Sequence, residues 1–154
     1  MERKFQSGYF PSKPCLIWDG KCGFCKFWIV RWKILTRETI DYVTYQSIYF
    51  VIPDISEQAF GQAIHLIEPD GRVYKGAEAA YRTLFYSNKW NFLYHYYQKL
   101  YLFQTISEIG YKFVSNHRPL LFKVTKILFG KNPARLRHYW LIYLMVILFS
   151  TFLF

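Results

Sequence analysis

Acidic residues are almost missing from the second half of this chain. Residues 71–154 hold only Glu78 and Glu108 against twelve lysines and arginines, whereas residues 1–70 hold eight residues of each sign. The whole formal net charge of +10 therefore lies in the second half. Such an excess requires an anionic partner, and the candidates are nucleic acid and the negatively charged face of a membrane.

Cysteine is scarce as well, with three residues in 154. Cys22 and Cys25 form a close pair, but no second paired spacing of cysteine or histidine accompanies them, so we expect no metal site. Cys15 lies in the apolar run that precedes the pair, and we expect it to be a small core residue.

The first 14 residues lack an apolar stretch of the signal-peptide type. Together with the basic second half, this absence predicts that the cysteine pair lies on the cytoplasmic side of a membrane. Structural disulfides are rare there, so a close pair is more typical of catalysis or metal binding than of a structural crosslink.

Hydrophobic residues, by contrast, are abundant, at 53% of the chain with 22% aromatic. Residues 139–154 contain no charge, glycine or proline, and as a helix they would span about 24 Å, short of the ~30 Å hydrocarbon core. Because a basic stretch precedes them, we expect a membrane-associated tail. A buried C-terminal helix and the first span of a longer membrane protein are the alternatives.

Aromatic side chains are most crowded between residues 90 and 103, too densely for one narrow helix face. Such a segment packs on two sides or lies against lipid, and stacking on nucleic-acid bases is a further use. Its apolar neighbours favour core or lipid contact. We therefore expect an anionic membrane surface, and no nucleic acid, as a partner.

The hydrophobic pattern predicts an α/β domain. The expected order is strand 15–18, helix 24–36, strand 40–45, a short helix near 53–60, a hairpin of 63–67 and 72–74, and helix 77–85. This β-α-β-α-β-β-α order is that of the thioredoxin fold. Extra C-terminal helices are expected at 107–116 and 119–129, the second opened by Pro119 and closed by Gly130.

The length suits one domain with an appendage. We expect four parts along the chain: an N-terminal extension (1–13), a thioredoxin-like domain with its C-terminal helices (14–122), a basic linker or helix (123–138) and a hydrophobic tail that is a candidate membrane segment (139–154).

The cysteine pair directly follows the first strand, so Cys22 is expected at the start of the first helix. There the backbone N–H groups and the helix dipole lower the pKa of a thiol from ~8.5 to about 3.5–7.5. Lys21 adds positive charge, and Cys25 lies one turn further in. Cys22 is therefore expected to attack a disulfide and Cys25 to resolve the mixed disulfide.

Asp19, Cys22 and Cys25 form the pattern Asp-x-x-Cys-x-x-Cys, which resembles the DCC family of thiol-disulfide oxidoreductase-like proteins. The resemblance extends to the segments 74–80 and 111–118 and covers about residues 14–122. It implies a thioredoxin-like fold and disulfide exchange through a redox-active Cys22–Cys25 disulfide, with no other cofactor and a protein or small-molecule disulfide or dithiol as substrate.

Asp19 has two interpretations. A buried carboxylate near the resolving thiol accepts and returns its proton, by analogy with thioredoxins. Alternatively, Asp19 holds the Asp19-Gly20 turn or caps the helix through backbone N–H groups. Both stay open at this point.

The chain departs from thioredoxins in two places. Gly61-Gln62-Ala63 stands where they have a cis-proline before the third strand, so substrate docking by strand addition is not expected to carry over. Phe24 stands inside the pair, so their redox potential does not transfer either. His117 and Arg118 are expected to cap a helix end, with phosphate or anionic lipid as the alternative ligand.

Two functions follow. The first is a membrane-associated thiol-disulfide oxidoreductase that uses Cys22 and Cys25. The second is a non-catalytic membrane adaptor, in which the thioredoxin-like core is a scaffold for a basic, aromatic second half.

Overall fold

The structure is a computed structural model that describes residues 6–144. Its elements follow in the order β1 (Cys15–Trp18), α1 (Gly23–Thr36), β2 (Asp41–Thr44), α2 (Tyr45–Ile48), the 3-10 turn η1 (Tyr49–Val51), α3 (Glu57–Gln62), β3 (His65–Ile67), β4 (Val73–Lys75), α4 (Gly76–Phe85), α5 (Phe92–Lys99), α6 (Tyr101–Asn116) and α7 (Arg118–Phe129).

The strands form one mixed sheet in the order β2-β1-β3-β4. β1 runs parallel to β2, as a helical crossover requires, while β3 is antiparallel to β1 and β4 is antiparallel to β3. In the central strand β1, Leu16 pairs with Tyr42 of β2 on one side and with Leu66 of β3 on the other. This topology confirms the predicted thioredoxin-like fold.

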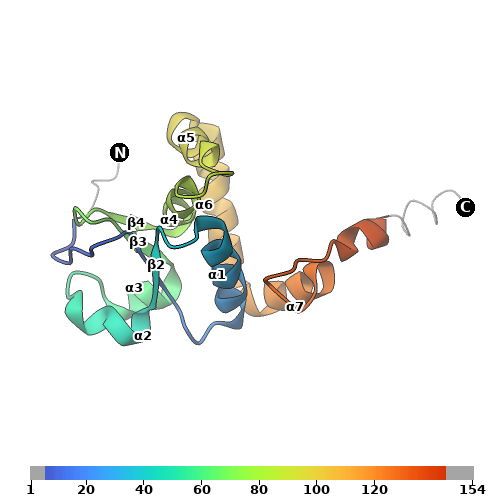
Figure 1. Cartoon of the computed structure of the whole chain (residues 1–154), viewed down its shortest axis with the longest axis horizontal. Helices are drawn as coiled ribbons and strands as arrows, with labels where there is room; N and C mark the ends of the chain where they lie inside the picture. The colour runs from blue at the N-terminus through green and yellow to red at the C-terminus, as the bar shows by residue number, and fades with distance from the viewer. Residues whose placement is uncertain (1–5, 145–154) are drawn as a thin grey trace, which may run out of the picture.

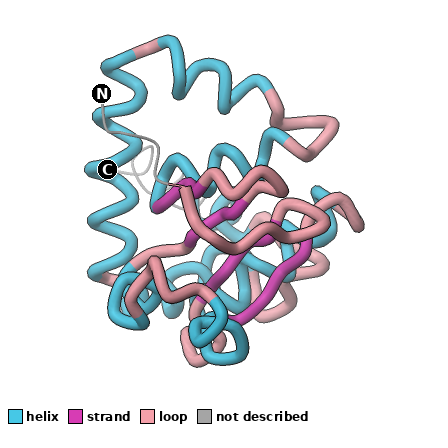
Figure 2. Tube along the Cα trace, turned by 90° about the vertical axis from the view of Figure 1, so that its left-hand side faces the viewer, coloured by secondary structure: helices cyan, strands magenta, loops and turns pink. Residues whose placement is uncertain are grey.

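Successive residues of β1 point to opposite faces of the sheet and build two cores. Cys15 and Ile17 pack with Phe60 and the isoleucines of the α2–α3 region, whereas Leu16 and Trp18 pack against α1 and α4. In Figure 1, α2 and α3 lie on one side of the strands and α1 on the other, and Figure 2 shows the strands as the middle layer. The sheet is therefore covered on both faces.

The hairpin between β3 and β4 turns as its sequence predicts. The N–H of Gly71 donates to the carbonyl of Glu68, and Gly71 has a φ of +80°. A Cβ at Gly71 would lie 2.8 Å from the carbonyl oxygen of Ser7, so both the backbone conformation and the available space require glycine.

A buried ion pair joins this hairpin to α4. Arg82 donates from Nε to Glu68 at 2.6 Å, and the Tyr86 hydroxyl donates to the second oxygen of the same carboxylate at 2.6 Å. The Arg82 guanidinium also lies over the ring of Phe85, 4.6 Å from its centre. The charge of Glu68 is thus paired and hydrogen-bonded inside the protein, as a buried carboxylate requires.

The aromatic segment near residues 90–103 is partly core and partly surface. Tyr94 and Tyr97 of α5 are buried against α4, while Phe92, Tyr96 and Tyr101 are exposed. The segment therefore does not pack on two sides along its whole length, and its exposed rings leave an apolar surface.

The segment 123–138, expected as a basic linker or helix, is helical in its first part and irregular in its second. α7 ends at Phe129, and residues 130–138 are not helical. The chain is helical again at 139–144, and the rest of the predicted hydrophobic tail, 145–154, lies outside the described residues. Between residues 6 and 144, no helix combines the length and the apolar character needed to cross a membrane.

Candidate functional site

Cys22 lies at the N-cap of α1, in extended backbone conformation, as the motif predicts. The backbone N–H of Cys25 donates to Sγ of Cys22 at 3.1 Å, and the two cysteines form a disulfide with Cα atoms 5.2 Å apart. The sulfur thus lies at the positive end of the helix dipole and accepts one of the N–H groups of the first turn, an arrangement that stabilises a negative charge on it.

Asp19 holds the turn that leads from β1 into α1. Its carbonyl accepts the N–H of Cys22 at 3.1 Å, and its Oδ1 accepts the N–H of Lys21 at 3.0 Å. Gln46 donates to the same Oδ1 at 2.8 Å and accepts the N–H of Gly20 at 3.1 Å. These contacts fit the turn-holding role, one of the two interpretations of Asp19, and Gln46 is a partner that the sequence pattern did not indicate.

The segment before β3 is held by the junction of α6 and α7. Ser115 and Arg118 both donate to the carbonyl of Gln62, and Arg118 also donates to the carbonyl of Gly61 at 3.1 Å. The Tyr111 hydroxyl accepts the N–H of Ile64 at 3.0 Å. The backbone that faces substrate in thioredoxins is therefore engaged by side chains of this chain itself.

These three side chains lie in the segment 111–118, where the sequence predicts a helix cap at His117 and Arg118, with phosphate or anionic lipid as the alternative ligand. His117 does contact the carbonyl of Phe113 near the end of α6, with Nδ1 at 2.8 Å. Arg118 instead reaches back to a segment more than 50 residues earlier. No local pattern indicates a contact over that distance.

An apolar cavity of about 460 Å³ opens beside the cysteine pair, between α1 and the α6–α7 helices. Cys25 and Asp19 line it, together with Phe24. The remaining wall is mostly aromatic and aliphatic and includes Trp28, Trp32, Phe60, Tyr111, Leu121, Val124 and Leu128. The pair thus lies at the edge of a cavity of the size of small-molecule sites.

Cys15 is removed from this site, in the core on β1, and is 2% exposed. Burial, helped by the charge of Asp41, raises the pKa of its thiol to about 12. A thiol in this state is not ionised near neutrality and is not a nucleophile. The prediction that Cys15 is a core residue is confirmed.

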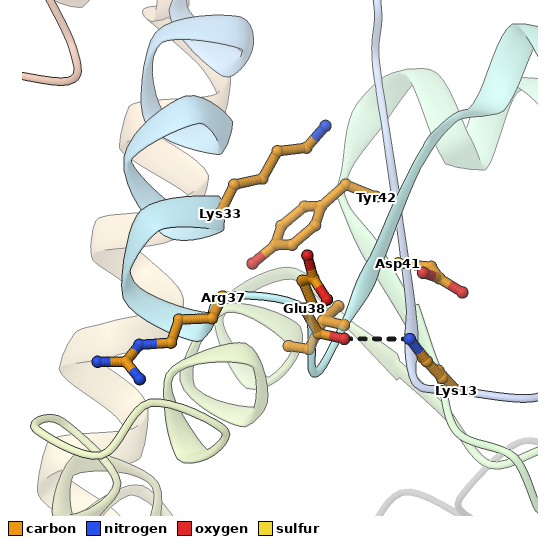
Figure 3. A pocket seen from close by; sticks show the side chains of 7 residues that line it. Lys13, Lys33, Arg37, Glu38, Asp41 and Tyr42 are labelled. Atoms are coloured by element: carbon orange, nitrogen blue, oxygen red, sulfur yellow. Dashed lines mark hydrogen bonds between the residues drawn. The ribbon is translucent and has the colours of Figure 1, made fainter.

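A second, open hollow of about 450 Å³ lies at the other end of α1 (Figure 3). Lys13 donates to the carbonyl of Glu38 there at 3.3 Å. Lys33, Arg37, Asp41 and Tyr42 complete its rim, so its charges are of both signs. This hollow is distinct from the cysteine site, which occupies the beginning of α1.

In the part of the chain that the structure describes, no group of three or more histidine, cysteine or acidic side chains is arranged to hold a metal ion. The site consists of the disulfide, the Asp19 turn and the apolar cavity.

A strand followed by a helix that starts with Cys-x-x-Cys, on a sheet of order β2-β1-β3-β4, defines a thioredoxin-like domain with a disulfide at the start of its first helix. The family model for DCC1-like thiol-disulfide oxidoreductases matches residues 16–124, which is well over half of the chain. The chain belongs to the DCC1-like thiol-disulfide oxidoreductase family. Comparison with curated proteins and with solved structures found no match.

Proposed function

We propose that this protein exchanges disulfides with a protein or small-molecule substrate through Cys22 and Cys25, with no cofactor other than the pair itself. The observation that carries the proposal is the position of Cys22 Sγ at the N-cap of α1, where it accepts the N–H of Cys25. A sulfur in that position is favoured as a thiolate, the species that attacks disulfides.

In the reductive direction, the Cys22 thiolate attacks one sulfur of a substrate disulfide, and the other substrate sulfur leaves as a thiolate. Cys25 then loses its proton and attacks Cys22. This step releases the second substrate sulfur as a thiol and closes the Cys22–Cys25 disulfide. The substrate gains two electrons and the pair loses two; the oxidative direction is the reverse.

The test is a trapping experiment on the purified full chain. Cys25→Ser is expected to accumulate a mixed disulfide through Cys22, whereas Cys22→Ser is not. The double variant Cys22→Ser/Cys25→Ser retains only Cys15 and is the matched control. A Cys25→Ser protein that traps no more disulfide partner than this control would refute the proposal.

Asp19 is proposed to have both of its roles. It holds the turn through Oδ1, and it lines the same cavity as Cys25, which supports a role as proton acceptor for the resolving thiol. Asp19→Asn keeps an acceptor oxygen for the turn. It is expected to slow the resolution of the mixed disulfide without lowering thermal stability. Unchanged resolution would leave only the turn-holding role.

Association with an anionic membrane surface on the cytoplasmic side is the second part of the proposal. α6 presents a stripe of exposed apolar side chains at helical spacing, Leu102, Ile106, Ile109 and Phe113. Lys99 and Lys112 are exposed on α5 and α6, within the basic half of the chain. An apolar stripe combined with basic residues is typical of helices that lie in the membrane interface.

Sedimentation with lipid vesicles tests this part. We expect binding to vesicles that contain phosphatidylglycerol, weaker binding to phosphatidylcholine alone, and a loss of binding with Ile106→Asp. Phe50→Asp is the matched control, because Phe50 is also an exposed apolar residue but lies on η1. Equal binding of both vesicle types would contradict an anionic partner.

The exposed stripe also suits the adaptor function, in which the domain is only a scaffold. The double variant Cys22→Ser/Cys25→Ser distinguishes the two functions. An adaptor retains full activity in complementation with this variant, whereas an oxidoreductase loses it.

A further inference from the structure

The apolar cavity contacts the cysteine pair from one side. Cys25 is part of its wall, whereas Cys22 is not. Cys22 lies at the helix start, where a substrate disulfide is proposed to react. The pair therefore has two approaches, one at Cys22 and one from the cavity at Cys25.

The wall of the cavity suits a flat ring with polar atoms on its edge. Aromatic side chains from three elements surround the space: Phe24, Trp28 and Trp32 of α1, Phe60 of α3 and Tyr111 of α6. Its volume of about 460 Å³ holds one substituted ring with a short apolar chain and falls within the range of about 300–1,000 Å³ typical of small-molecule sites.

Several hydrogen-bond donors belong to this wall, among them the side chains of Trp28, Tyr111 and Arg118. The indole N–H of Trp28 is shielded from water and has no acceptor among the described residues. Buried polar groups are normally paired. Because Trp28 belongs to the wall, a bound molecule whose carbonyl oxygen displaces the neighbours that shield this N–H would supply the acceptor that it lacks. The Tyr111 hydroxyl accepts the N–H of Ile64, so its own proton is directed elsewhere, and burial raises its pKa and keeps that proton in place.

We propose that the cavity binds a quinone, and that the quinone is the electron acceptor that reoxidises the reduced cysteine pair through Cys25. A quinone combines the features that this wall fits: a flat apolar ring, carbonyl oxygens that accept hydrogen bonds and the capacity to take two electrons. This inference rests on the proposed function of the pair and extends it by naming the second substrate.

The reaction balances without a further reactant. Cys22 and Cys25, both reduced, lose their two thiol protons and two electrons, and the S–S bond forms between them. The quinone gains the two electrons and the two protons, so both carbonyl oxygens become hydroxyls and a hydroquinone leaves the cavity. The pair then accepts electrons from the next dithiol substrate at Cys22.

Binding is measured first, with the oxidised full chain, in which the closed disulfide has no electrons to give. The probe is a benzoquinone with a ten-carbon chain, titrated by calorimetry, with decyl alcohol as an apolar probe that lacks the quinone ring. We expect the quinone to bind at least tenfold more tightly than the alcohol. Equal affinity for the two probes, or no binding of the quinone, would overturn the proposal.

Two variants locate the site. Trp28→Phe keeps a ring but removes the N–H, and a lost hydrogen bond of ordinary strength weakens binding up to about tenfold. Val124→Phe adds bulk at the exposed rim of the cavity and is expected to abolish binding. Val51→Phe is the matched control, an exposed valine on η1 outside the cavity, and binds the quinone like the unaltered chain. If both cavity variants bind the quinone as tightly as the unaltered chain, the quinone does not bind in this cavity and the proposal is wrong.

Electron transfer is measured next, with the reduced full chain and the same quinone. We expect the loss of two thiols per hydroquinone formed, followed by the absorbance of the quinone. Exchange with a disulfide peptide is measured separately. A chain that exchanges with the peptide but neither binds nor reduces the quinone refutes this inference alone, whereas a chain that fails to exchange refutes the proposed function.

Discussion

His65 makes the stability of this protein depend on pH in a way that the structure specifies. Its side chain is 3% exposed, its Nδ1 lies 3.0 Å from the carbonyl of Ala63, and its ring meets that of Phe60 with centres 5.0 Å apart. Burial, together with the charge of Lys75 on the neighbouring strand, lowers the pKa of His65 to about 4, although the contact with the Ala63 carbonyl opposes this shift. The folded protein therefore holds this imidazole neutral.

The sign follows from proton uptake. In the unfolded chain the pKa of a histidine is about 6.5, so His65 is protonated there below that pH. In the folded protein His65 stays neutral until the pH falls to about 4. The contribution of His65 to the free energy of unfolding is therefore present above pH 6.5 and is lost as the pH drops toward 4. A pKa difference of about 2.5, at about 1.4 kcal/mol for each unit, corresponds to a total of about 3.5 kcal/mol.

The perturbation is His65→Met, which keeps an apolar side chain of similar size and removes the titration. Urea unfolding at pH 7.5 and pH 4.5, followed by tryptophan fluorescence, measures the free energy of unfolding of both proteins. We expect the unaltered chain to lose about 2.5 kcal/mol more than His65→Met between these pH values. Carboxylates titrate in both proteins and cancel in the difference.

His117→Asn is the matched control, since His117 is exposed. It is expected to lose stability in parallel with the unaltered chain. If His65→Met also loses stability in parallel with the unaltered chain, the burial of a neutral imidazole does not account for the pH dependence, and the reasoning is wrong.

Two further predictions concern stability. Gly71→Ala is expected to lower the free energy of unfolding by about 1–2 kcal/mol, because the new Cβ meets the carbonyl of Ser7 and the residue has a positive φ. Gly61→Ala in α3 places a Cβ that meets no atom, and it is expected to raise the free energy of unfolding by about 0.5–1 kcal/mol. Urea unfolding checks both, and a shift of equal sign would contradict the turn geometry. Arg82→Ala leaves the buried Glu68 carboxylate without its cation and is expected to cost about 3–5 kcal/mol, much of it recovered in Glu68→Leu/Arg82→Met. A double variant no more stable than Arg82→Ala would show that the unpaired charge is not the cause.

Much of the sheet was predictable because its signals are local. The apolar run 15–18 became β1, and the Asp70-Gly71 turn formed between β3 and β4. The start of α6 was not predictable in the same way: the helix begins at Tyr101, six residues before the expected Ser107, and no side chain caps its start. Its position depends on packing, such as the hydrogen bond from Tyr97 to Glu108 at 2.5 Å.

The candidate site likewise has features that local sequence predicts and features that depend on distant contacts. The motif alone placed Cys22 at the N-cap and Asp19 in the turn before it, because both roles are decided within a few residues. The contacts of Ser115 and Arg118 with the carbonyl of Gln62 join segments more than 50 residues apart. The cavity likewise exists only where separate helices meet, so neither feature has a counterpart in the sequence pattern.

The core position of Cys15 has a practical consequence for measurements on this chain. Because its thiol is buried and un-ionised, a mild alkylating reagent labels two cysteines in the reduced folded protein and three after unfolding. The mass of the labelled chain then reports two separate properties. The first two labels count the electrons stored in the Cys22–Cys25 pair, and the third counts the molecules that have lost their fold.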